Sequence, residues 1–164
     1  IIYPTDTLYG FGCDAKNDKA INKINHLKNR VSPMSVIAPS KRIVKSWLNI
    51  KESHKREALS FIDGGKTIIA PVYENIVSKK ICGNNNSLGI RIPNHPFCTL
   101  LSNNFPNPIT TTSVNRTKMP AMTELLKIIK EFSKEVDLII EDGNINQKGS
   151  EIRMLKKDIW IRIR

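Results

Sequence analysis

Residues 3–15 read YPTDTLYGFGCDA, and the fold depends on how this stretch is understood. Within it, residues 10–15 match G-x-G-x-x-A, the glycine pattern of a dinucleotide-binding turn. That turn needs a strand directly before its first glycine and an acidic residue about 20 positions later. Here a proline-containing turn precedes the glycines, and neither Asp nor Glu occurs between Asp18 and Glu52. The sequence therefore argues against a dinucleotide-binding fold, and the glycines are better explained as turn and packing residues.

A second phosphate-binding pattern fails a similar test. Gly65-Lys66-Thr67 resembles the end of a Walker A loop, but that loop has an earlier glycine and follows a strand. This chain has Ser60 at the position of the earlier glycine, and the β-branched residues that predict a strand come after the motif. We interpret Gly64 and Gly65 as a turn that enters a strand.

Length and composition are those of one folded domain. The chain has 164 residues, 40% of them hydrophobic and 25% charged, which is enough apolar material for one core. We expect a single domain over residues 1–164. Because residue 1 is Ile and already reads as part of a strand, we also expect the start of that domain to be missing.

Charge and cysteine content restrict the partners and the compartment. A net charge of +11 favours polyphosphates, nucleic acid or anionic membrane as partners, although solvated lysine alone can explain it. The 3 cysteines form no C-x-x-C pair, which fits a reducing compartment. No apolar run approaches the length of a bilayer span and no signal-like segment opens the chain. We expect a soluble, cytoplasmic protein without a membrane partner.

Short β-branched runs alternate with segments of helical spacing, which is typical of an α/β fold with a mixed sheet. The pattern predicts helices over residues 18–30, 40–47, 57–62, 96–101 and 123–132. It predicts strands over residues 1–3, 34–38, 67–72, 88–92, 109–112, 136–140 and 158–164. In the last strand the isoleucines face one side, and the opposite side, which carries two arginines, suits an anion or water. We expect residues 76–87 to form a long loop that can move over a site.

Four separate segments combine hydroxyl, amide and basic side chains near predicted strand ends and turns. They are residues 3–7 (YPTDT), 27–30 (LKNR), 90–96 (IRIPNHP) and 111–115 (TTSVN). In mixed sheets, ligands gather at strand ends and at the loops that leave them. This mixture of groups suits a ligand that has phosphates and a carboxylate. Taken singly, each segment is more simply explained as a turn, a cap or a cation at a helix C-terminus.

Taken together and in this order, these segments resemble the threonylcarbamoyl-AMP synthase family, also called the YrdC or TsaC family. The resemblance covers essentially the whole chain and rests on six motifs in the right order and spacing. The matching positions are Tyr3–Gly12 (Tyr-Pro-Thr-Asp-Thr-x-Tyr-Gly-x-Gly), Lys28 and Arg30 (Lys-x-Arg), Arg91–Pro96 (Arg-x-Pro-x-His-Pro), Ser113–Asn115 (Ser-x-Asn), Ser150 before the penultimate strand and Arg162 in the last strand.

The resemblance implies a twisted sheet of mixed parallel and antiparallel strands, flanked by helices around a concave basic cavity. It implies an L-threonylcarbamoyladenylate synthase, a nucleotidyltransferase that makes threonylcarbamoyl-AMP and pyrophosphate from L-threonine, bicarbonate and ATP. A protein complex would then transfer the threonylcarbamoyl group to tRNA, on the adenosine next to the anticodon. The chain would represent the single-domain branch of the family.

Family position also implies roles for individual residues. Lys28 and Arg30 would be catalytic, because they would neutralise the triphosphate. ATP would be bound by Lys28, Arg30, Ser113, Asn115 and Arg162, and threonine by Thr5, Arg91, Thr112 and Ser150. No covalent nucleophile is needed, because catalysis would rest on bringing the substrates together and neutralising phosphate charge. Mg²⁺ would be carried on the ATP phosphates, and Asp6 is the nearest acidic candidate to contact it.

Some positions depart from the family pattern, and two other functions stay open. Ser32 stands where the family has lysine, and Lys118 stands where it has glycine. Gly65 belongs to a turn in which the family has Pro-Gly-Pro, and residues 162–164 (RIR) replace the final Arg-x-Gly. One alternative is a module that binds tRNA or double-stranded RNA with little catalysis, for which steep salt dependence is expected. The other is a carbamoyl-adenylate-forming domain of the hydrogenase-maturation type.

Overall fold

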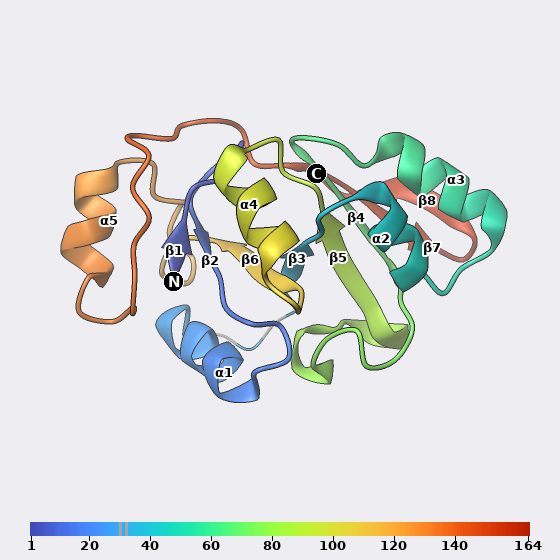
Figure 1. Cartoon of the computed structure of the whole chain (residues 1–164), viewed down its shortest axis with the longest axis horizontal. Coiled ribbons are helices and arrows are strands. Elements are labelled where there is room, and N and C mark those ends of the chain that lie inside the picture. The colour runs from blue at the N-terminus through green and yellow to red at the C-terminus, as the bar shows by residue number, and fades with distance from the viewer. Residues whose placement is uncertain (30, 32) are drawn as a thin grey trace.

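One eight-stranded sheet runs through the molecule in the order β1-β2-β6-β3-β5-β4-β7-β8, so strands from both ends of the chain join it (Figure 1). The computed structural model describes residues 1–29, 31 and 33–164. The strands are β1 (Ile2–Tyr3), β2 (Gly10–Phe11), β3 (Ser35–Ile37), β4 (Lys66–Pro71), β5 (Ser87–Arg91), β6 (Ile109–Ser113), β7 (Glu151–Lys156) and β8 (Ile159–Arg162). β3 pairs with β5, and β4 with β7, in parallel, while the other pairs are antiparallel. The predicted mixed α/β sheet is therefore confirmed.

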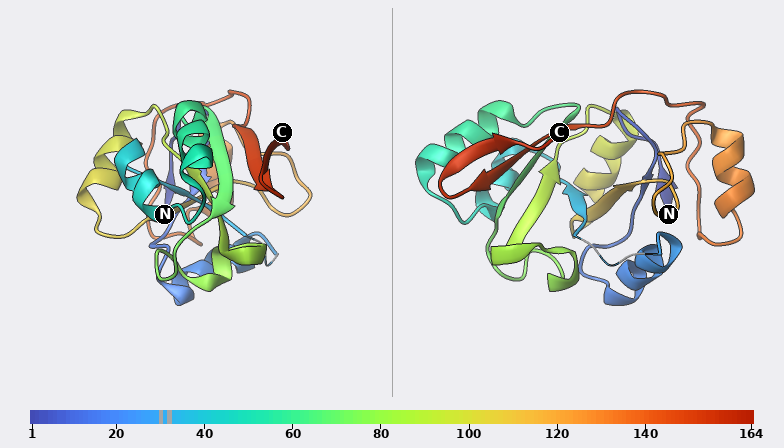
Figure 2. Two further views of the ribbon diagram at one scale, coloured as in Figure 1. Left: turned by 90° about the vertical axis from the view of Figure 1, so that its right-hand side faces the viewer. Right: turned by 180° about the vertical axis from the view of Figure 1, so that it is seen from behind.

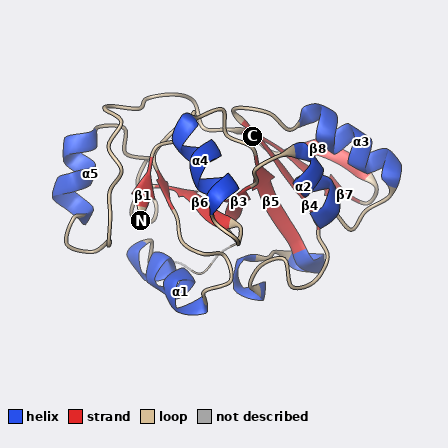
Figure 3. Cartoon of the chain, in the orientation of Figure 1, coloured by secondary structure: helices blue, strands red, loops and turns tan. Residues whose placement is uncertain are grey.

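Helices flank the sheet, and α2, α3 and α4 lie on the same side of it (Figures 2 and 3). The helices are α1 (Asp18–Leu27), α2 (Lys41–Trp47), α3 (Glu52–Phe61), α4 (Pro96–Asn104) and α5 (Leu125–Phe132), with the short 3₁₀ helices η1 (Lys79–Ile81) and η2 (Asn84–Asn86). Among the described residues, none of the helices is long and apolar enough to cross a membrane.

Side-chain caps and a proline begin three of the helices. The Asn17 side chain accepts a hydrogen bond from the backbone N–H of Ala20 at the start of α1. At the start of α2, the Ser40 side chain accepts one from the backbone N–H of Ile43. Pro96 occupies the first turn of α4, where its missing N–H costs no hydrogen bond. Asn29, with φ of 45°, follows α1, which ends at Leu27 rather than at the predicted residue 30.

The core explains the glycines of the opening stretch. Phe11 packs edge-on against Phe132 of α5, with ring centroids 5.1 Å apart. A Cβ atom on Gly12 would lie 2.4 Å from Cε1 of Tyr3, so this position accepts only glycine without rearrangement. Gly10 lies in β2 itself and pairs with Ser113. The interpretation of these glycines as packing residues is confirmed.

Three sequence predictions about elements are wrong. Residues 136–140 form no strand, because β1 offers only two residues and the contact is reduced to a bridge between Ile2 and Ile139. Residues 76–87 are not a loose loop: they hold η1 and η2, and Val77 and Ile81 are buried in the core. Helix α3 is longer than predicted and begins at Glu52.

The last strand alternates as predicted, but its isoleucine side is the solvent side. Ile159 is 64% exposed and Ile161 is 38% exposed. Trp160 packs against the core, and on the paired strand Arg153 stacks on Phe61 of α3 at 4.1 Å. Residues of α3 lie over the side of the sheet that carries Trp160 and Arg153, so that side is the covered one. The side predicted to suit an anion or water is therefore covered at Trp160, whereas the side chain of Arg162, on the same side, is 71% exposed.

Candidate functional site

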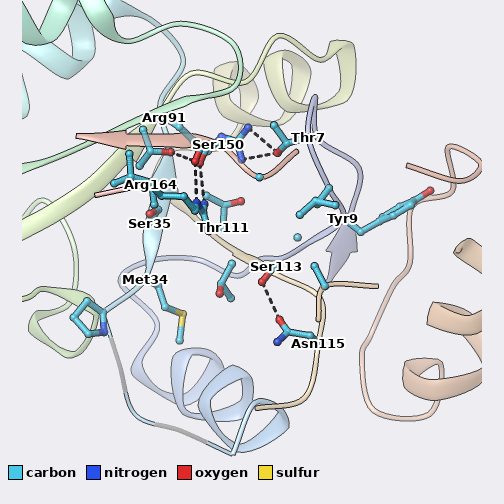
Figure 4. A pocket seen from close by; sticks show the side chains of 18 of the residues that line it. Thr7, Tyr9, Met34, Ser35, Arg91, Thr111, Ser113, Asn115, Ser150 and Arg164 are labelled. Atoms are coloured by element: carbon cyan, nitrogen blue, oxygen red, sulfur yellow. Dashed lines mark hydrogen bonds between the residues drawn. The ribbon is translucent and has the colours of Figure 1, made fainter. Parts of the chain in front are cut away.

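A cavity of about 410 Å³ opens over six neighbouring strands, β2, β6, β3, β5, β4 and β7 (Figure 4). Thr111 lies beside Ser35, and Thr67 lies between Arg91 and Ile152, because these residues are register partners in the sheet. Strand alternation produces the lining: Ile68 of β4 is buried in the core, whereas Thr67 next to it faces the cavity. Hydroxyl, amide and guanidinium groups line the cavity. Within the described part of the chain, no Asp or Glu side chain lines it.

Arg91 lies at one end of the cavity and is 7% exposed. Its Nη2 donates to Oδ1 of Asp6, and both Nη atoms donate to Oγ1 of Thr7 at 3.1 Å. Its Nε is buried without a hydrogen-bond partner among the described residues. Asp6 also accepts from the backbone N–H groups of Gly65 at 2.8 Å and Asn94 at 2.9 Å. Asp6 thus joins Arg91 to the turn before β4 and to the loop after β5.

Both carboxylate oxygens of Asp6 accept hydrogen bonds from N–H donors, and a contact of Asp6 with Mg²⁺ stays a prediction. Across residues 1–29, 31 and 33–164, no group of three or more His, Cys, Asp or Glu could hold a metal ion. Where Mg²⁺ binds stays a prediction.

Thr5 shapes the turn that follows β1. Its Oγ1 donates to the carbonyl of Leu8 at 2.7 Å and accepts from the backbone N–H groups of Thr7 and Leu8 at 3.2 Å. Thr5 is 2% exposed and does not line the cavity, whereas Thr7 does. The turn that Thr5 closes therefore presents Thr7 to Arg91 and to the cavity, and direct contact of Thr5 with a substrate stays a prediction.

The Ser-x-Asn motif forms the other end of the cavity. The Oγ of Ser113 donates to Oδ1 of Asn115 at 2.8 Å, and Nδ2 of Asn115 donates to the carbonyl of Met119 at 2.7 Å. Lys28, which caps α1 and is 2% exposed, places its Nζ 2.7 Å from Oδ1 of Asn115 and 2.5 Å from the carbonyl of Ser113. A buried ammonium group thus supports the turn from behind.

Ser150 and Arg164 close the cavity on the side of β7. The Oγ of Ser150 lies 2.9 Å from Oγ1 of Thr67, and Arg164 donates from Nε to the Ser150 carbonyl at 3.0 Å. The backbone carbonyl of Arg164 accepts from Ile152 at 2.9 Å, which holds the residue next to the cavity. The side chain of Arg162 is 71% exposed, lies 3.8 Å from Glu151 and does not line the cavity.

Comparison with known proteins identifies the family. The Sua5/YciO/YrdC family model, described as "Telomere recombination", matches residues 1–164. The chain belongs to this family. A family member from Methanocaldococcus jannaschii, assigned provisionally as a threonylcarbamoyl-AMP synthase, is 34% identical over 100% of this chain and 78% of its own length. The threonylcarbamoyl-AMP synthase of Haemophilus ducreyi is 27% identical over 93% of this chain and 85% of its own length.

Solved structures of the Sua5/YciO/YrdC family have the same fold. The crystal structure of P. abyssi Sua5 complexed with L-threonine matches with a TM-score of 0.87 and 24% identity. The match covers 99% of this chain and 49% of that protein, so the chain spans about half of P. abyssi Sua5. The YrdC-like fold that the sequence predicts is confirmed.

Within this family fold, most residues predicted for the site come together. Those that line the cavity are Arg91, Thr112, Ser113, Asn115 and Ser150. Those that contact lining residues or their turns from behind are Thr5, Asp6 and Lys28. Arg162 lies outside the cavity lining, and Arg30 lies outside the described residues. The ligand assigned to each residue stays a prediction.

Sequence reasoning missed several lining residues. They are Thr7, Ser35, Thr67, Thr111 and Arg164. Thr7 and Thr111 lie inside the segments 3–7 and 111–115, so their side chains could have been predicted as site residues. Arg164 shares its side of the last strand with Arg162, and alternation alone cannot separate the two. Ser35 and Thr67 carry no signal beyond being hydroxyls in β-branched segments.

Proposed function

We propose that this chain is an L-threonylcarbamoyladenylate synthase of the nucleotidyltransferase class, which makes threonylcarbamoyl-AMP and pyrophosphate from L-threonine, bicarbonate and ATP. Relatives of that name, 25–30% identical over at least 93% of the chain, support the activity. The crystal structure of P. abyssi Sua5 complexed with L-threonine supports L-threonine as a substrate of this chain.

The observation that carries the proposal is the chemistry of the cavity. Bicarbonate, ATP and the carboxylate of threonine are all anions, and the lining groups are hydroxyls, an amide and guanidinium groups. Such groups bind carboxylates and phosphates through charge-assisted hydrogen bonds. No described Asp or Glu lines the cavity, so the lining adds no negative charge that would repel ATP, bicarbonate or the carboxylate of threonine, and the carboxylate of Asp6 is paired with Arg91.

The proposed reaction uses this arrangement without a covalent intermediate. The amine of threonine attacks bicarbonate and water leaves, which gives the carbamate. A carbamate oxygen then attacks the α-phosphate of ATP, and pyrophosphate leaves. Ser113 and Asn115 would hold the α-phosphate end, with the ammonium of Lys28 2.7 Å behind Asn115, where it stabilises negative charge that builds up on the phosphate. Most of the rate gain would come from holding three reactants in one cavity.

Cofactor, partners and location follow from this activity. Mg²⁺ would enter on the phosphates of ATP, because the described residues offer no cluster of acidic side chains that could hold it. The product would pass to the protein complex that transfers the threonylcarbamoyl group to tRNA in the cytoplasm. The net charge of +11 is compatible with direct tRNA contact, which a salt titration of binding would measure.

Neither alternative is favoured by the comparisons. The relatives that are 27–34% identical over at least 93% of this chain are named for threonylcarbamoyl-AMP synthesis, not for RNA binding alone or for hydrogenase maturation. An RNA-binding module would lose affinity steeply with salt and would tolerate alanine at Ser113 or Arg91. A carbamoyl-adenylate-forming domain would use carbamoyl phosphate in place of threonine and bicarbonate.

The deciding experiment measures pyrophosphate release from Mg·ATP with L-threonine and bicarbonate, and with each one left out. We expect release only when both are present. Carbamoyl phosphate, supplied without threonine, is the control for the hydrogenase-maturation alternative. Release that is independent of threonine would overturn the proposal, and so would the absence of release from a folded protein.

A further inference from the structure

Residues 141–150, which we call the strap, lead to β7 from the α5 side of the molecule without forming a helix or a strand (Figure 1). The strap ends at Gly149 and Ser150, which line the cavity. A segment of this kind lacks the ladder of hydrogen bonds that fixes a strand, so its course depends on a few individual contacts. The contacts that hold the strap therefore also decide where Ser150 lies.

Tyr9 and His95 hold the beginning of the strap, and the proposed reaction uses neither side chain. The hydroxyl of Tyr9 donates to the carbonyl of Gly143 at 2.8 Å and accepts from the backbone N–H of Asp142 at 2.8 Å. Nε2 of His95 lies 2.9 Å from Oδ2 of Asp142. Tyr9 is buried in the core, and the side chain of His95 is only 14% exposed. Both residues are therefore fixed points to which the strap is attached.

The direction of the hydrogen bond between His95 and Asp142 follows from the second ring nitrogen. Nδ1 of His95 accepts from the backbone N–H of Phe97 at 3.2 Å, where His95 caps α4. A neutral imidazole that accepts at Nδ1 carries its proton on Nε2. Nε2 therefore donates to the carboxylate of Asp142, and a hydrogen bond to an ionised acceptor is among the stronger ones.

Further along the strap, a backbone contact ties it to the cavity itself. The N–H of Gln147 donates to the carbonyl of Thr7, which lines the cavity, at 3.2 Å. Ser150 follows three residues later, and its Oγ lies 2.9 Å from Oγ1 of Thr67. A displacement of the strap at Asp142 is thus passed on to the cavity through a short stretch of chain.

We propose that His95 is a positioning residue of the proposed reaction: through Asp142 it fixes the strap and so holds Ser150 in the cavity. His95 does not line the cavity, so it acts on the substrate only through the strap. Tyr9 supports the same end of the strap through its two hydrogen bonds. The inference rests on the proposed function, because Ser150 is among the residues predicted to bind threonine.

The test is the variant Asp142→Ala, which removes the carboxylate but leaves the cap of α4 by His95 intact. Hydrogen exchange of the free protein, followed by mass spectrometry, should show residues 141–149 exchanging at least about tenfold faster, because one hydrogen bond to a charged group is lost. In the pyrophosphate-release assay, the KM for L-threonine should rise about tenfold. The KM for ATP should stay within about twofold, because Ser113 and Asn115 lie at the other end of the cavity (Figure 4).

Three variants separate the hydrogen bond from other effects. Glu141→Ala removes the neighbouring exposed carboxylate and should leave the exchange of the strap and both KM values unchanged. Asp142→Asn keeps an oxygen that can accept from His95, so its KM for L-threonine should stay within about threefold of wild type. His95→Ala combined with Asp142→Ala should raise that KM no further than His95→Ala alone, because the two residues act through one contact.

Three results would overturn the inference. The first is unchanged exchange of the strap in Asp142→Ala, the second is an equal rise in the KM values for L-threonine and ATP, and the third is additive effects of His95→Ala and Asp142→Ala. A wild-type protein that releases pyrophosphate without threonine would instead remove the proposed function. Hydrogen exchange would still decide in that case whether His95 holds the strap, because it needs no substrate.

Discussion

At the scale of single residues, the site depends on buried polar groups whose partners come from distant parts of the sequence. Asp6 bonds Arg91, 85 residues away, and Lys28 bonds Asn115, 87 residues away. Burying a charge is costly unless hydrogen bonds and an opposite charge compensate for it. Each pair is therefore a point at which the fold and the site depend on the same atoms.

The prediction at the scale of residues concerns the buried pair of Asp6 and Arg91. Asp6→Asn leaves the guanidinium of Arg91 buried without its counter-charge and weakens one of the contacts to Gly65 and Asn94. We expect the free energy of unfolding in urea to fall by about 3 kcal/mol. The matched control is Asp137→Asn, which breaks the exposed ion pair with Lys23. Equal losses in the two variants would contradict a special role for the buried pair.

At the scale of elements, packing partners decide which side of a strand is buried. In β8, the alternation of Ile159, Trp160 and Ile161 is visible in the sequence, but hydropathy alone selects the wrong side as the covered one. Trp160 packs on the core because α3 lies on its side of the sheet. The predicted strand over residues 136–140 is absent for a related reason, since β1 is too short to pair with it.

The element-scale prediction compares neighbours in β8. Trp160→Ala should lower the free energy of unfolding by about 2 to 4 kcal/mol, because it removes a large side chain packed on the core. Ile159→Ala, one position away and 64% exposed, should lower it by less than about 1 kcal/mol. Urea unfolding of both variants measures the difference. A larger loss for Ile159→Ala would show that the isoleucine side of β8 is covered in solution.

At the scale of the whole molecule, the sheet order gathers residues that the sequence scatters. β2, β6, β3, β5, β4 and β7 lie side by side although their order in the chain is different, and the cavity crosses all of them. The same burial that builds the core also suppresses ionisation. Burial raises the pKa of the Cys98 thiol to about 12 and also raises the pKa values of Cys13, Cys82 and Tyr3.

These pKa shifts predict how the stability of the whole molecule depends on pH. An unfolded cysteine has a pKa of about 8.5, so above that pH the unfolded chain loses thiol protons that the folded chain keeps. The contribution of the thiols to the free energy of unfolding should therefore be constant below about pH 8 and should fall as the pH rises toward the folded value of about 12 for Cys98.

Alkylation with iodoacetamide at pH 8.5, followed by peptide mass spectrometry, measures the same property at Cys98. The thiol, 1% exposed, should stay unmodified in the native protein and react once urea unfolds it. Cys13 and Cys82, which are partly exposed, should react earlier. Rapid modification of native Cys98 would contradict the burial described here.

Much of this protein could be predicted from its sequence alone. Local signals, such as the cap at Ser40, the proline that opens α4 and the β-branched run of β6, depend on neighbouring residues and so can be read from the sequence. Motif order predicted the family, and it predicted five residues that line the cavity. The glycines of residues 3–15 could be interpreted as packing residues because the sequence requirements of a dinucleotide-binding turn, the alternative explanation, are also local.

Only the tertiary structure decided the rest, because it depends on which elements become neighbours. Strand order brought Ser35 and Thr67 into the cavity, although nothing near them in the sequence marks them. The end of β8 placed Arg164 inside and Arg162 outside, although both lie on one side of the predicted strand. Asp6 became the partner of Arg91 through a turn and a strand end that meet only in space. Sequence patterns report spacing along the chain, whereas charge compensation and burial depend on distances between segments.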